Sequence, residues 1–312
     1  MCLFPLRARF NEEGGRPSLD PDGDIALPCG KCYECISKRA FDWATRCRHE
    51  LSLHNESCFL TLTYNPEHLP SDFIVKADFQ KFLKRLRKTK KLRYMVSYEY
   101  GTKNFRPHMH AIIFGWSPSD QEFLMNSPAG YPLYTSKEVS KYWCDPETRN
   151  EIGYHSIGQA NEKTAYYIAS YALKGKERTI IHPNTGEEVT LRDEMDSSKR
   201  PAIGLEYFLD NVDQLVASGE PLPRYYEKKL EQLYPDLFDF YYQRKQENIS
   251  SRSSQNLYDK HVNIEAKKNL TTDTFRDLTD TSIKENDFKR NRLKQNKNLY
   301  YDSKKSKGEK NE

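Results

Sequence analysis

The feature that most constrains the fold is a pair of β-forming runs separated by a short turn. The first run is Arg93 to Tyr100 and the second is Pro107 to Phe114, and both are rich in aromatic or β-branched residues. Because only residues 101–106 connect them, the two runs are predicted to pair as an antiparallel hairpin. The hairpin decides which of their side chains share a face.

Two histidines stand on the second strand of this hairpin. Residues two apart on a strand point to the same face, so His108 and His110 project together, whereas Met109 and Ala111 point into a core. Two imidazoles can hold one divalent cation, and Glu99 can add a carboxylate from across the hairpin. An isolated His-x-His pair is more often a pair of surface residues, so the pattern alone does not establish a metal site.

A stripe of polar and aromatic residues lies on a helix predicted for residues 161–175, with Gly175 as its stop. Tyr167, Tyr171 and Lys174 are spaced so that they share one side of that helix. A tyrosine phenolate can attack a phosphodiester and hold the phosphate covalently, and a lysine can stabilise the developing charge or help to deprotonate the tyrosine. The alternative is an aromatic core stripe with a snorkelling lysine. Tyr166, off the stripe, is predicted to be structural.

Other elements follow from periodicity and turn residues. Ser37 is predicted to cap one helix and Asp78 a second, which buries one apolar stripe and exposes a basic face. Residues 116–160 are predicted to be a loop-rich insertion. The predicted elements are a helix over 37–54, a strand over 58–64, a helix from Asp78 with Phe79, Phe82, Leu83 and Leu86 inward, and short helices around 206–218 and 224–242.

Three of these motifs, in this order, resemble the HUH superfamily of rolling-circle endonucleases. The strand Phe59–Tyr64 is similar to the first motif of the superfamily, His108-Met109-His110 to its metal motif, and Tyr167-x3-Tyr171-x2-Lys174 to its two-tyrosine motif. Flanking segments resemble the replication initiators of gokushovirus-type microviruses, over about two thirds of the chain from Cys2 to about Phe208. These segments are Pro28–Cys32, Trp43–Cys47, Lys81–Arg87, Tyr98–Gly101, Phe105–His108 and Ile203–Tyr207.

The resemblance implies an α+β domain whose central antiparallel sheet is flanked by helices and carries both histidines. It implies Mg²⁺ or Mn²⁺ held by His108, His110 and a third polar ligand, which we assign to Glu99. One tyrosine would nick single-stranded DNA at the replication origin and form a 5′-phosphotyrosyl enzyme. The free 3′-OH would prime rolling-circle synthesis, and the second tyrosine would attack the regenerated origin so that the ends can be rejoined. The resemblance thus implies a metal-dependent nicking and joining endonuclease of a bacteriophage.

A cluster of cysteines near the N-terminus indicates a second metal site. Cys29, Cys32 and Cys35 are spaced for tetrahedral thiolate coordination, and structural zinc usually takes four ligands. Cys2 is our choice for the fourth, because chains of the family resembled begin with a similar cysteine; Cys47 and His49 are alternatives. Zinc would stabilise an N-terminal segment that is otherwise predicted to be irregular. Free thiols on a loop and an iron–sulfur cluster remain open.

A basic block between Lys76 and Arg93 favours a nucleic-acid partner. It holds nine Lys or Arg residues and one acid, Asp78, and such clusters displace the counterions of a DNA backbone. A solvated helix face is the competing interpretation. The residues assigned to DNA contact are Lys81, Lys84, Arg85, Arg87, Lys88 and Arg106.

Composition divides the chain into three regions. Residues 1–36 are a Cys-rich, zinc-stapled segment, residues 37–243 the endonuclease domain, and residues 244–312 a polar tail with few hydrophobic residues that is predicted to be disordered. The sequence shows neither a secretion signal nor an apolar run of membrane-spanning length. It predicts action in the cytoplasm of the bacterial host, on single-stranded and origin DNA, with a host helicase and the replication machinery as further partners.

Two alternatives to the replication initiator remain. A relaxase or transposase of the same superfamily would share the active site, although relaxases usually carry a third histidine in the metal motif. A non-enzymatic, zinc-stapled DNA-binding protein would use the cysteines and the basic block, with Tyr167 and Tyr171 in its core. Replacing both tyrosines by phenylalanine separates an enzyme from a binding module, because only the enzyme has cleavage to lose.

Overall fold

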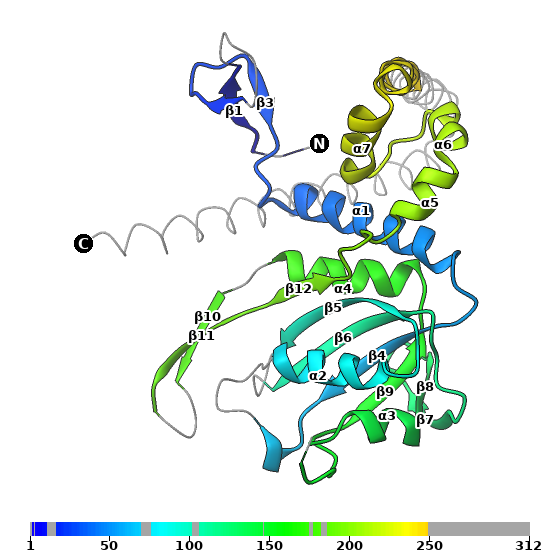
Figure 1. Ribbon diagram of the computed structural model, residues 1–312. Coiled ribbons are helices and arrows are strands. Elements are labelled where there is room, and N and C mark those ends of the chain that lie inside the picture. The colour runs from blue at the N-terminus through cyan, green and yellow to red at the C-terminus, as the bar shows by residue number, and fades with distance from the viewer. Residues whose placement is uncertain are drawn as a thin grey trace, which may run out of the picture. The chain divides into compact units, whose positions relative to one another are not determined.

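A computed structural model describes residues 2, 4–10, 17–69, 76–101, 106–145, 147–174, 177–181 and 186–248 (Figure 1). The side chains of residues 171–174 and 177–178 lie outside the described part. The chain forms two compact units. One holds residues 36–215 and 222–233, and the other holds residues 1–35, 216–221 and the chain from 234 onward.

The larger unit is built on an antiparallel sheet of seven strands. The predicted hairpin over 93–100 and 107–114 is confirmed residue for residue, and the strand predicted over 58–64 runs one residue earlier. In spatial order the strands are β12 (Glu194–Ser197), β5 (Arg93–Tyr100), β6 (Pro107–Phe114), β4 (Ser57–Thr63), β9 (His155–Gln159), β8 (Pro132–Thr135) and β7 (Glu122–Asn126).

Two helices, α2 (Lys76–Leu86) and α3 (Lys137–Tyr142), share a core with one face of this sheet. The apolar stripe predicted for α2 is confirmed, because Phe79, Phe82, Leu83 and Leu86 are all fully buried. The predicted cap is wrong: α2 begins at Lys76, so Asp78 lies in its first turn and accepts a hydrogen bond from the Tyr64 hydroxyl (3.1 Å).

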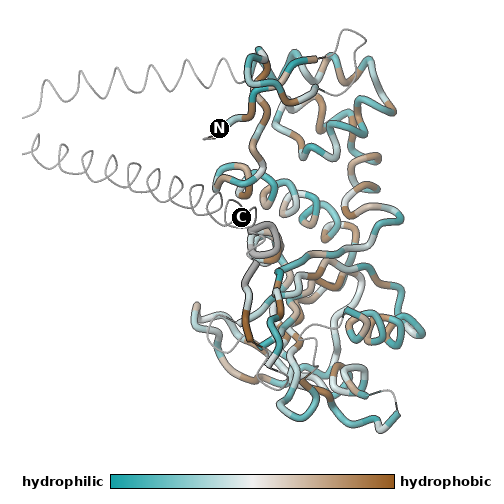
Figure 2. Tube along the Cα trace, turned by 90° about the vertical axis from the view of Figure 1, so that its left-hand side faces the viewer, coloured by the Kyte–Doolittle hydropathy of each residue, from teal (hydrophilic) through white to brown (hydrophobic). Residues whose placement is uncertain are grey.

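The opposite face packs against helices α1 (Tyr33–Leu51) and α4 (Glu162–Lys174). Helix α1 begins before Ser37, which therefore lies within the helix rather than capping it as predicted. Helix α4 follows the prediction closely, and Asn161 caps it by accepting a hydrogen bond from the Thr164 N–H (3.0 Å). Apolar and polar residues alternate along such elements (Figure 2), as one-sided packing requires.

Two segments are more regular than their sequence indicates. Residues 116–160 are not a loop-rich insertion, because they contribute β7, β8, α3 and β9 to the large unit. Residues 1–36 are not irregular, because they form a three-stranded sheet in the order β2-β1-β3. Its strands are β1 (Leu6–Arg9), β2 (Ser18–Leu19) and β3 (Ile25–Leu27). All these strands are short, so pairing with neighbours rather than intrinsic propensity defines them.

The remaining elements follow the large sheet along the chain. Strands β10 (Glu177–Ile181) and β11 (Glu188–Arg192) form a separate ribbon. The helices predicted around 206–218 and 224–242 are present as α5 (Leu205–Asp210), α6 (Val212–Ser218) and α7 (Arg224–Leu233), with further helical backbone over 235–248. The predicted tail lies outside the described residues from 249 onward. Among the described helices, none is both long enough and apolar enough to span a bilayer.

A buried histidine on α1 makes stability depend on pH. His49 stacks on the rings of Tyr207 (4.2 Å) and Tyr226 (5.7 Å), and burial lowers its pKa from 6.5 to about 4. Between these values the unfolded chain binds a proton that the folded chain does not, so stability falls as the pH drops. We expect His49 to contribute about 2 kcal/mol less stability at pH 5 than at pH 7.

Urea unfolding followed by tryptophan fluorescence at both pH values checks this expectation. His49→Phe retains a stacking ring and removes the titration, so the stability lost between pH 7 and pH 5 should shrink. Other buried histidines, His108, His110 and His155, also have lowered pKa values and will keep part of the slope. An unchanged slope in the variant would contradict this role.

Candidate functional site

Two rows of paired residues cross the centre of the large sheet. In the first row Glu99 on β5 pairs with His108 on β6, and His108 pairs with Thr63 on β4. In the second row Ser97, His110 and Thr61 pair in the same way. Directly paired residues and residues two apart on a strand project to one face, so all six side chains share a face.

The predicted metal ligands meet at the end of these rows. One ligand atom from each of Glu99, His108 and His110 lies within 4.8 Å of the others. His108 Nε2 is 3.9 Å from a Glu99 carboxylate oxygen, and the two imidazole rings are 4.9 Å apart in an edge-to-face arrangement. Two imidazoles and one carboxylate form a donor set that suits a divalent metal with open coordination positions.

Hydrogen bonds to the far side of each ligand orient it. Thr61 Oγ1 lies 3.0 Å from His110 Nδ1, and the Arg106 carbonyl oxygen lies 3.1 Å from His108 Nδ1. Because Nδ1–H donates to these oxygens, the Nε2 lone pair of each ring is left for a metal. The Ser97 hydroxyl donates a short hydrogen bond to the carboxylate of Glu99. The ligands are therefore preorganised by their neighbours.

Burial keeps both histidines neutral. It lowers the pKa of His110 from 6.5 to about 3, helped by the nearby charge of His108, and it also lowers the pKa of His108. A metal binds the neutral imidazole, so neither ring has to lose a proton near neutral pH. The Glu99 side chain is only 4% exposed, and a buried carboxylate there needs a compensating positive charge. A bound cation meets both requirements.

Asp193 is a residue of this site that the sequence did not reveal. Glu194 begins β12 opposite Tyr98, so Asp193, one residue earlier, lies at the level of Glu99. Asp193 is 5% exposed, and its charge favours the protonated form of His108, which raises that pKa against the effect of burial. The site therefore holds a second buried acid. Only strand pairing brings it there, which explains why motif spacing missed it.

Helix α4 presents one of the predicted nucleophiles to the histidines. The ring of Tyr167 lies 5.3 Å from the ring of His110 and 6.4 Å from that of Phe59, both edge to face, and its side chain is 37% exposed. The helix continues through Tyr171 and Lys174, whose side chains lie outside the described residues. Tyr167 is thus both close to the candidate metal site and accessible.

Tyr166 faces a different neighbour, as its position off the stripe predicts. Its ring packs 4.8 Å from that of Phe41, and its hydroxyl lies 3.4 Å from the Ser37 hydroxyl on α1. These contacts join α4 to α1, which is a structural role.

The four predicted cysteine ligands also meet. The Sγ atoms of Cys2, Cys29, Cys32 and Cys35 lie within 4.8 Å of one another. Backbone N–H groups of Cys29 and Cys32 point at two of the sulfurs, each at 3.3 Å, and would stabilise thiolates. Four thiols at this spacing fit tetrahedral zinc.

The two alternative ligands for that cluster have other contacts. Cys47 is fully buried with its Sγ 3.2 Å from the sulfur of Met95, and His49 Nδ1 lies 3.2 Å from the Tyr226 hydroxyl. Neither is needed to complete a four-sulfur site.

The basic residues assigned to DNA contact divide into two groups. Arg85 donates to the carbonyl oxygens of Tyr142 and Cys144, and Arg106 donates to that of Tyr64, so both also hold the fold together. Lys81 pairs with Asp78 at 3.2 Å. The exposed cations Lys84, Arg87 and Lys88 remain the best placed of the set for solvent or DNA.

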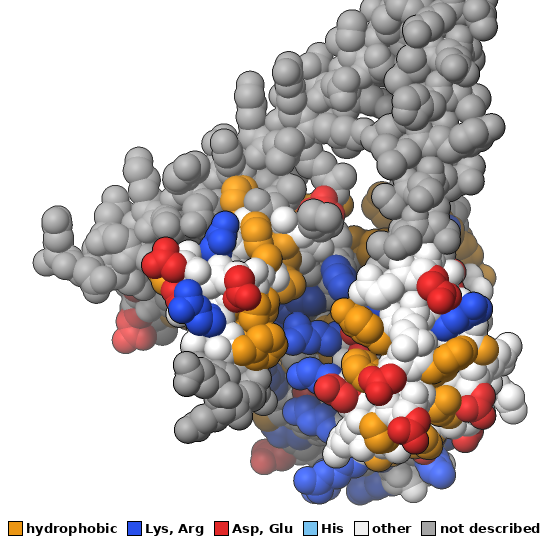
Figure 3. Space-filling view, turned by 90° about the horizontal axis from the view of Figure 1, so that it is seen from above, with side chains coloured by type: hydrophobic (Ala, Val, Ile, Leu, Met, Phe, Trp, Pro, Cys, Tyr) orange, Lys and Arg blue, Asp and Glu red, His pale blue; other side chains and the backbone are white. Residues whose placement is uncertain are grey.

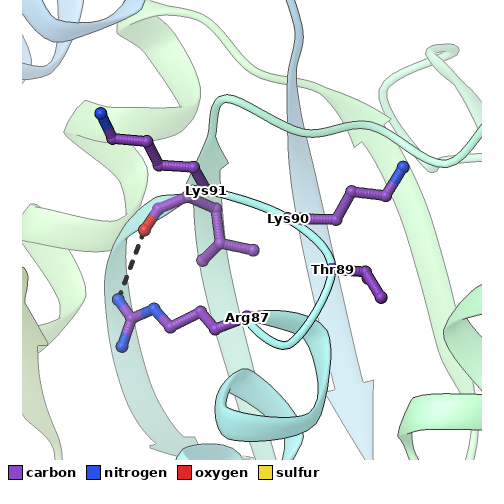
Figure 4. A pocket seen from close by; sticks show the side chains of 5 residues that line it. Arg87, Thr89, Lys90 and Lys91 are labelled. Carbon is purple, nitrogen blue, oxygen red and sulfur yellow. Dashed lines mark hydrogen bonds between the residues drawn. The ribbon is translucent and has the colours of Figure 1, made fainter.

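The loop after α2 adds basic residues to this group. Arg87, Thr89, Lys90, Lys91 and Leu92 line a shallow pocket of about 430 Å³ (Figure 4), in which Arg87 bends back to the Leu92 carbonyl (3.5 Å). Elsewhere Lys and Arg side chains gather in the middle of the face seen from above (Figure 3). The exposed charge is therefore grouped rather than evenly spread.

Comparison with known proteins places these motifs in a family. Residues 57–176, which contain β4, the hairpin and α4, match the family model for replication-associated proteins of the ORF2 type. The chain is 30% identical over 259 residues to "Replication-associated protein VP4" of Bdellovibrio phage phiMH2K, covering 75% of this chain and 78% of the relative.

Two further relatives are similar. The chain is 28% identical over 295 residues to "Replication-associated protein ORF2" of Spiroplasma virus 4, covering 81% of this chain and 87% of the relative. It is 28% identical over 256 residues to "Replication-associated protein ORF4" of Chlamydia phage 1, covering 75% and 62%. No solved structure matches the chain significantly. By these similarities and by the motifs gathered on its sheet, the chain belongs to the family of replication-associated proteins of microviruses.

Proposed function

We propose that this protein is a metal-dependent nicking and joining endonuclease that starts rolling-circle replication of a circular single-stranded phage genome. The observation that carries the proposal is the placement of Tyr167, an accessible phenol on α4, 5.3 Å from the imidazole of His110. A tyrosine beside a histidine and carboxylate cluster is the arrangement that phosphodiester transfer to a protein requires. Family membership makes DNA replication the process that this chemistry serves.

A divalent metal, Mg²⁺ or Mn²⁺, would be held by His108, His110 and Glu99 and would polarise the scissile phosphate. The Tyr167 oxygen attacks phosphorus as its phenolic proton leaves, and a bond forms between the two. The bond from phosphorus to the 3′ oxygen breaks, and that oxygen takes up a proton to become the free 3′-OH. The product is a 5′-phosphotyrosyl enzyme.

Joining reverses this step. Tyr171, one helical turn after Tyr167, attacks the origin regenerated by synthesis, and the 3′-OH released there attacks the first phosphotyrosine. The phosphodiester re-forms and the first phenol leaves, so a circle of unit length is released. Lys174 belongs to the same helix and is assigned to charge stabilisation or deprotonation of a tyrosine. The process would take place in the cytoplasm of the bacterial host, together with its helicase and replication machinery.

The cysteine cluster has a structural role in this proposal. Zinc held by Cys2, Cys29, Cys32 and Cys35 would stabilise the small N-terminal sheet. None of the chemical steps needs a redox centre, so zinc is preferred to an iron–sulfur cluster.

A nicking assay on single-stranded fragments that tile the phage genome tests the proposal. We expect one fragment to be cut when Mn²⁺ is present and none to be cut without added metal. The exposed cations around α2 favour one competing function, a non-enzymatic DNA-binding protein. Fragments that bind but are never cut, at any metal concentration, would favour that alternative.

A further inference from the structure

An exposed tyrosine stands beside the candidate metal site and has no part in the reaction above. Tyr154 directly precedes β9, yet 61% of its side chain is exposed. Its carbonyl oxygen accepts hydrogen bonds from the Thr63 N–H (2.8 Å) and the Thr63 hydroxyl (3.3 Å). A Cβ on Gly153 would lie 1.7 Å from the Thr63 carbonyl oxygen, so the chain approaches β4 closely here. The ring of Tyr154 is therefore held on a fixed backbone.

Strand pairing places this ring on the face that carries the metal ligands. Thr63 pairs with His108 on one side and, through the hydrogen bond to its N–H, with Tyr154 on the other. Paired residues project to the same face of a sheet. Two strand spacings separate Tyr154 from His108, which is about 10 Å along the row.

A cation accompanies the ring. The guanidinium carbon of Arg106 lies 5.6 Å from the centre of the Tyr154 ring. Arg106 precedes His108 by two residues, so alternation along the strand puts it on the same face. Two of its five N–H groups donate to the Tyr64 carbonyl, which fixes the guanidinium and leaves the other N–H groups for an anion.

We infer that Tyr154 and Arg106 form a nucleotide-binding subsite for single-stranded DNA beside the scissile phosphate. The ring of Tyr154 stacks on a base, and the guanidinium of Arg106 binds a backbone phosphate of the same strand. An exposed ring next to a cation suits this ligand, because stacking accepts any base and the cation attracts phosphate. The inference rests on the proposed function, since it takes as ligand the strand that reaches His108 and Tyr167.

Binding without cleavage tests the subsite. Fluorescence anisotropy would follow labelled oligothymidine, and an abasic strand of equal length, on the full-length protein without divalent metal. Tyr154→Ala should weaken oligothymidine binding about 5- to 100-fold, the range expected for loss of one base–aromatic stack, and should leave the abasic strand unaffected. Tyr154→Phe should bind like the unaltered protein. Tyr131, which is also 61% exposed, provides the matched control, and Tyr131→Ala should change nothing.

The outcomes separate the subsite from the proposed activity. Oligothymidine affinity that is unchanged in Tyr154→Ala, or lowered equally in Tyr131→Ala, would overturn the subsite even if the protein nicks DNA as proposed. If the protein never nicks DNA but Tyr154→Ala selectively weakens binding to strands that carry bases, the subsite stands and the nicking proposal fails.

Discussion

Replacing His110 by alanine is expected to abolish both metal binding and nicking. His110 supplies one of two imidazoles within 4.8 Å of the Glu99 carboxylate, so its loss leaves a site with two protein ligands. We expect Mn²⁺ affinity to fall by about a hundredfold or more, and nicking by about a thousandfold, because the metal provides several kcal/mol of charge stabilisation. Isothermal titration with Mn²⁺ measures the first effect and the cleavage assay the second.

Two further variants show whether the effect belongs to the metal site. Thr61→Val keeps every ligand and removes the hydroxyl 3.0 Å from His110 Nδ1, so metal affinity should fall by about 10- to 100-fold. His68→Ala removes a histidine that contacts Asn65 instead, and both readouts should stay normal. Wild-type Mn²⁺ affinity in His110→Ala would show that the metal, if required, binds elsewhere.

Loss of the cysteine cluster is expected to unfold the N-terminal sheet. Of the residues in β1, β2 and β3, only Ala8 is buried, so hydrophobic packing contributes little to its stability. Structural zinc can contribute about 10 kcal/mol or more of folding free energy in small domains. The double variant Cys29→Ser and Cys32→Ser should therefore lose one equivalent of zinc by elemental analysis, and residues 6–27 should lose protection from hydrogen exchange.

Cys144→Ser serves as the control for thiol replacement. Its sulfur donates to the Lys141 carbonyl at 3.2 Å, a bond that serine can reproduce, and zinc content should not change. Purified protein that contains no zinc, with the sheet equally protected in the double cysteine variant, would contradict a structural metal.

The central hairpin was predictable because its sequence carries two independent signals. Alternation along 93–100 and 107–114 defines both strands, and the short connection defines their pairing. Helix α2 was similarly accessible, since Phe79, Phe82 and Leu86 recur at helical spacing. Its start was misplaced because a helix can extend past a good capping residue when earlier residues also favour helix. Strands β7 and β8 were missed because an exposed edge strand such as β7 has no buried face to produce alternation.

The candidate site was predictable to the extent that its members are close in sequence. His108 and His110 share a strand, and Glu99 lies across a tight hairpin, so local geometry brings them together. Asp193 and Tyr154 reach the same rows through β12 and β9, whose pairing partners lie far away in the sequence. Arg85 and Arg106 looked like free cations, because no sequence pattern shows that a guanidinium will bind a distant backbone carbonyl.

The most direct test of the account is a search for a covalent protein–DNA adduct. Full-length protein is incubated with Mn²⁺ and the fragment that contains the origin, denatured in detergent, and analysed by gel and by intact mass. We predict an adduct that carries one DNA strand on a tyrosine, and no adduct in the double variant Tyr167→Phe and Tyr171→Phe, which should still bind DNA. An adduct that persists in the double variant, or metal-dependent cleavage that never leaves DNA attached to the protein, would contradict the tyrosine mechanism.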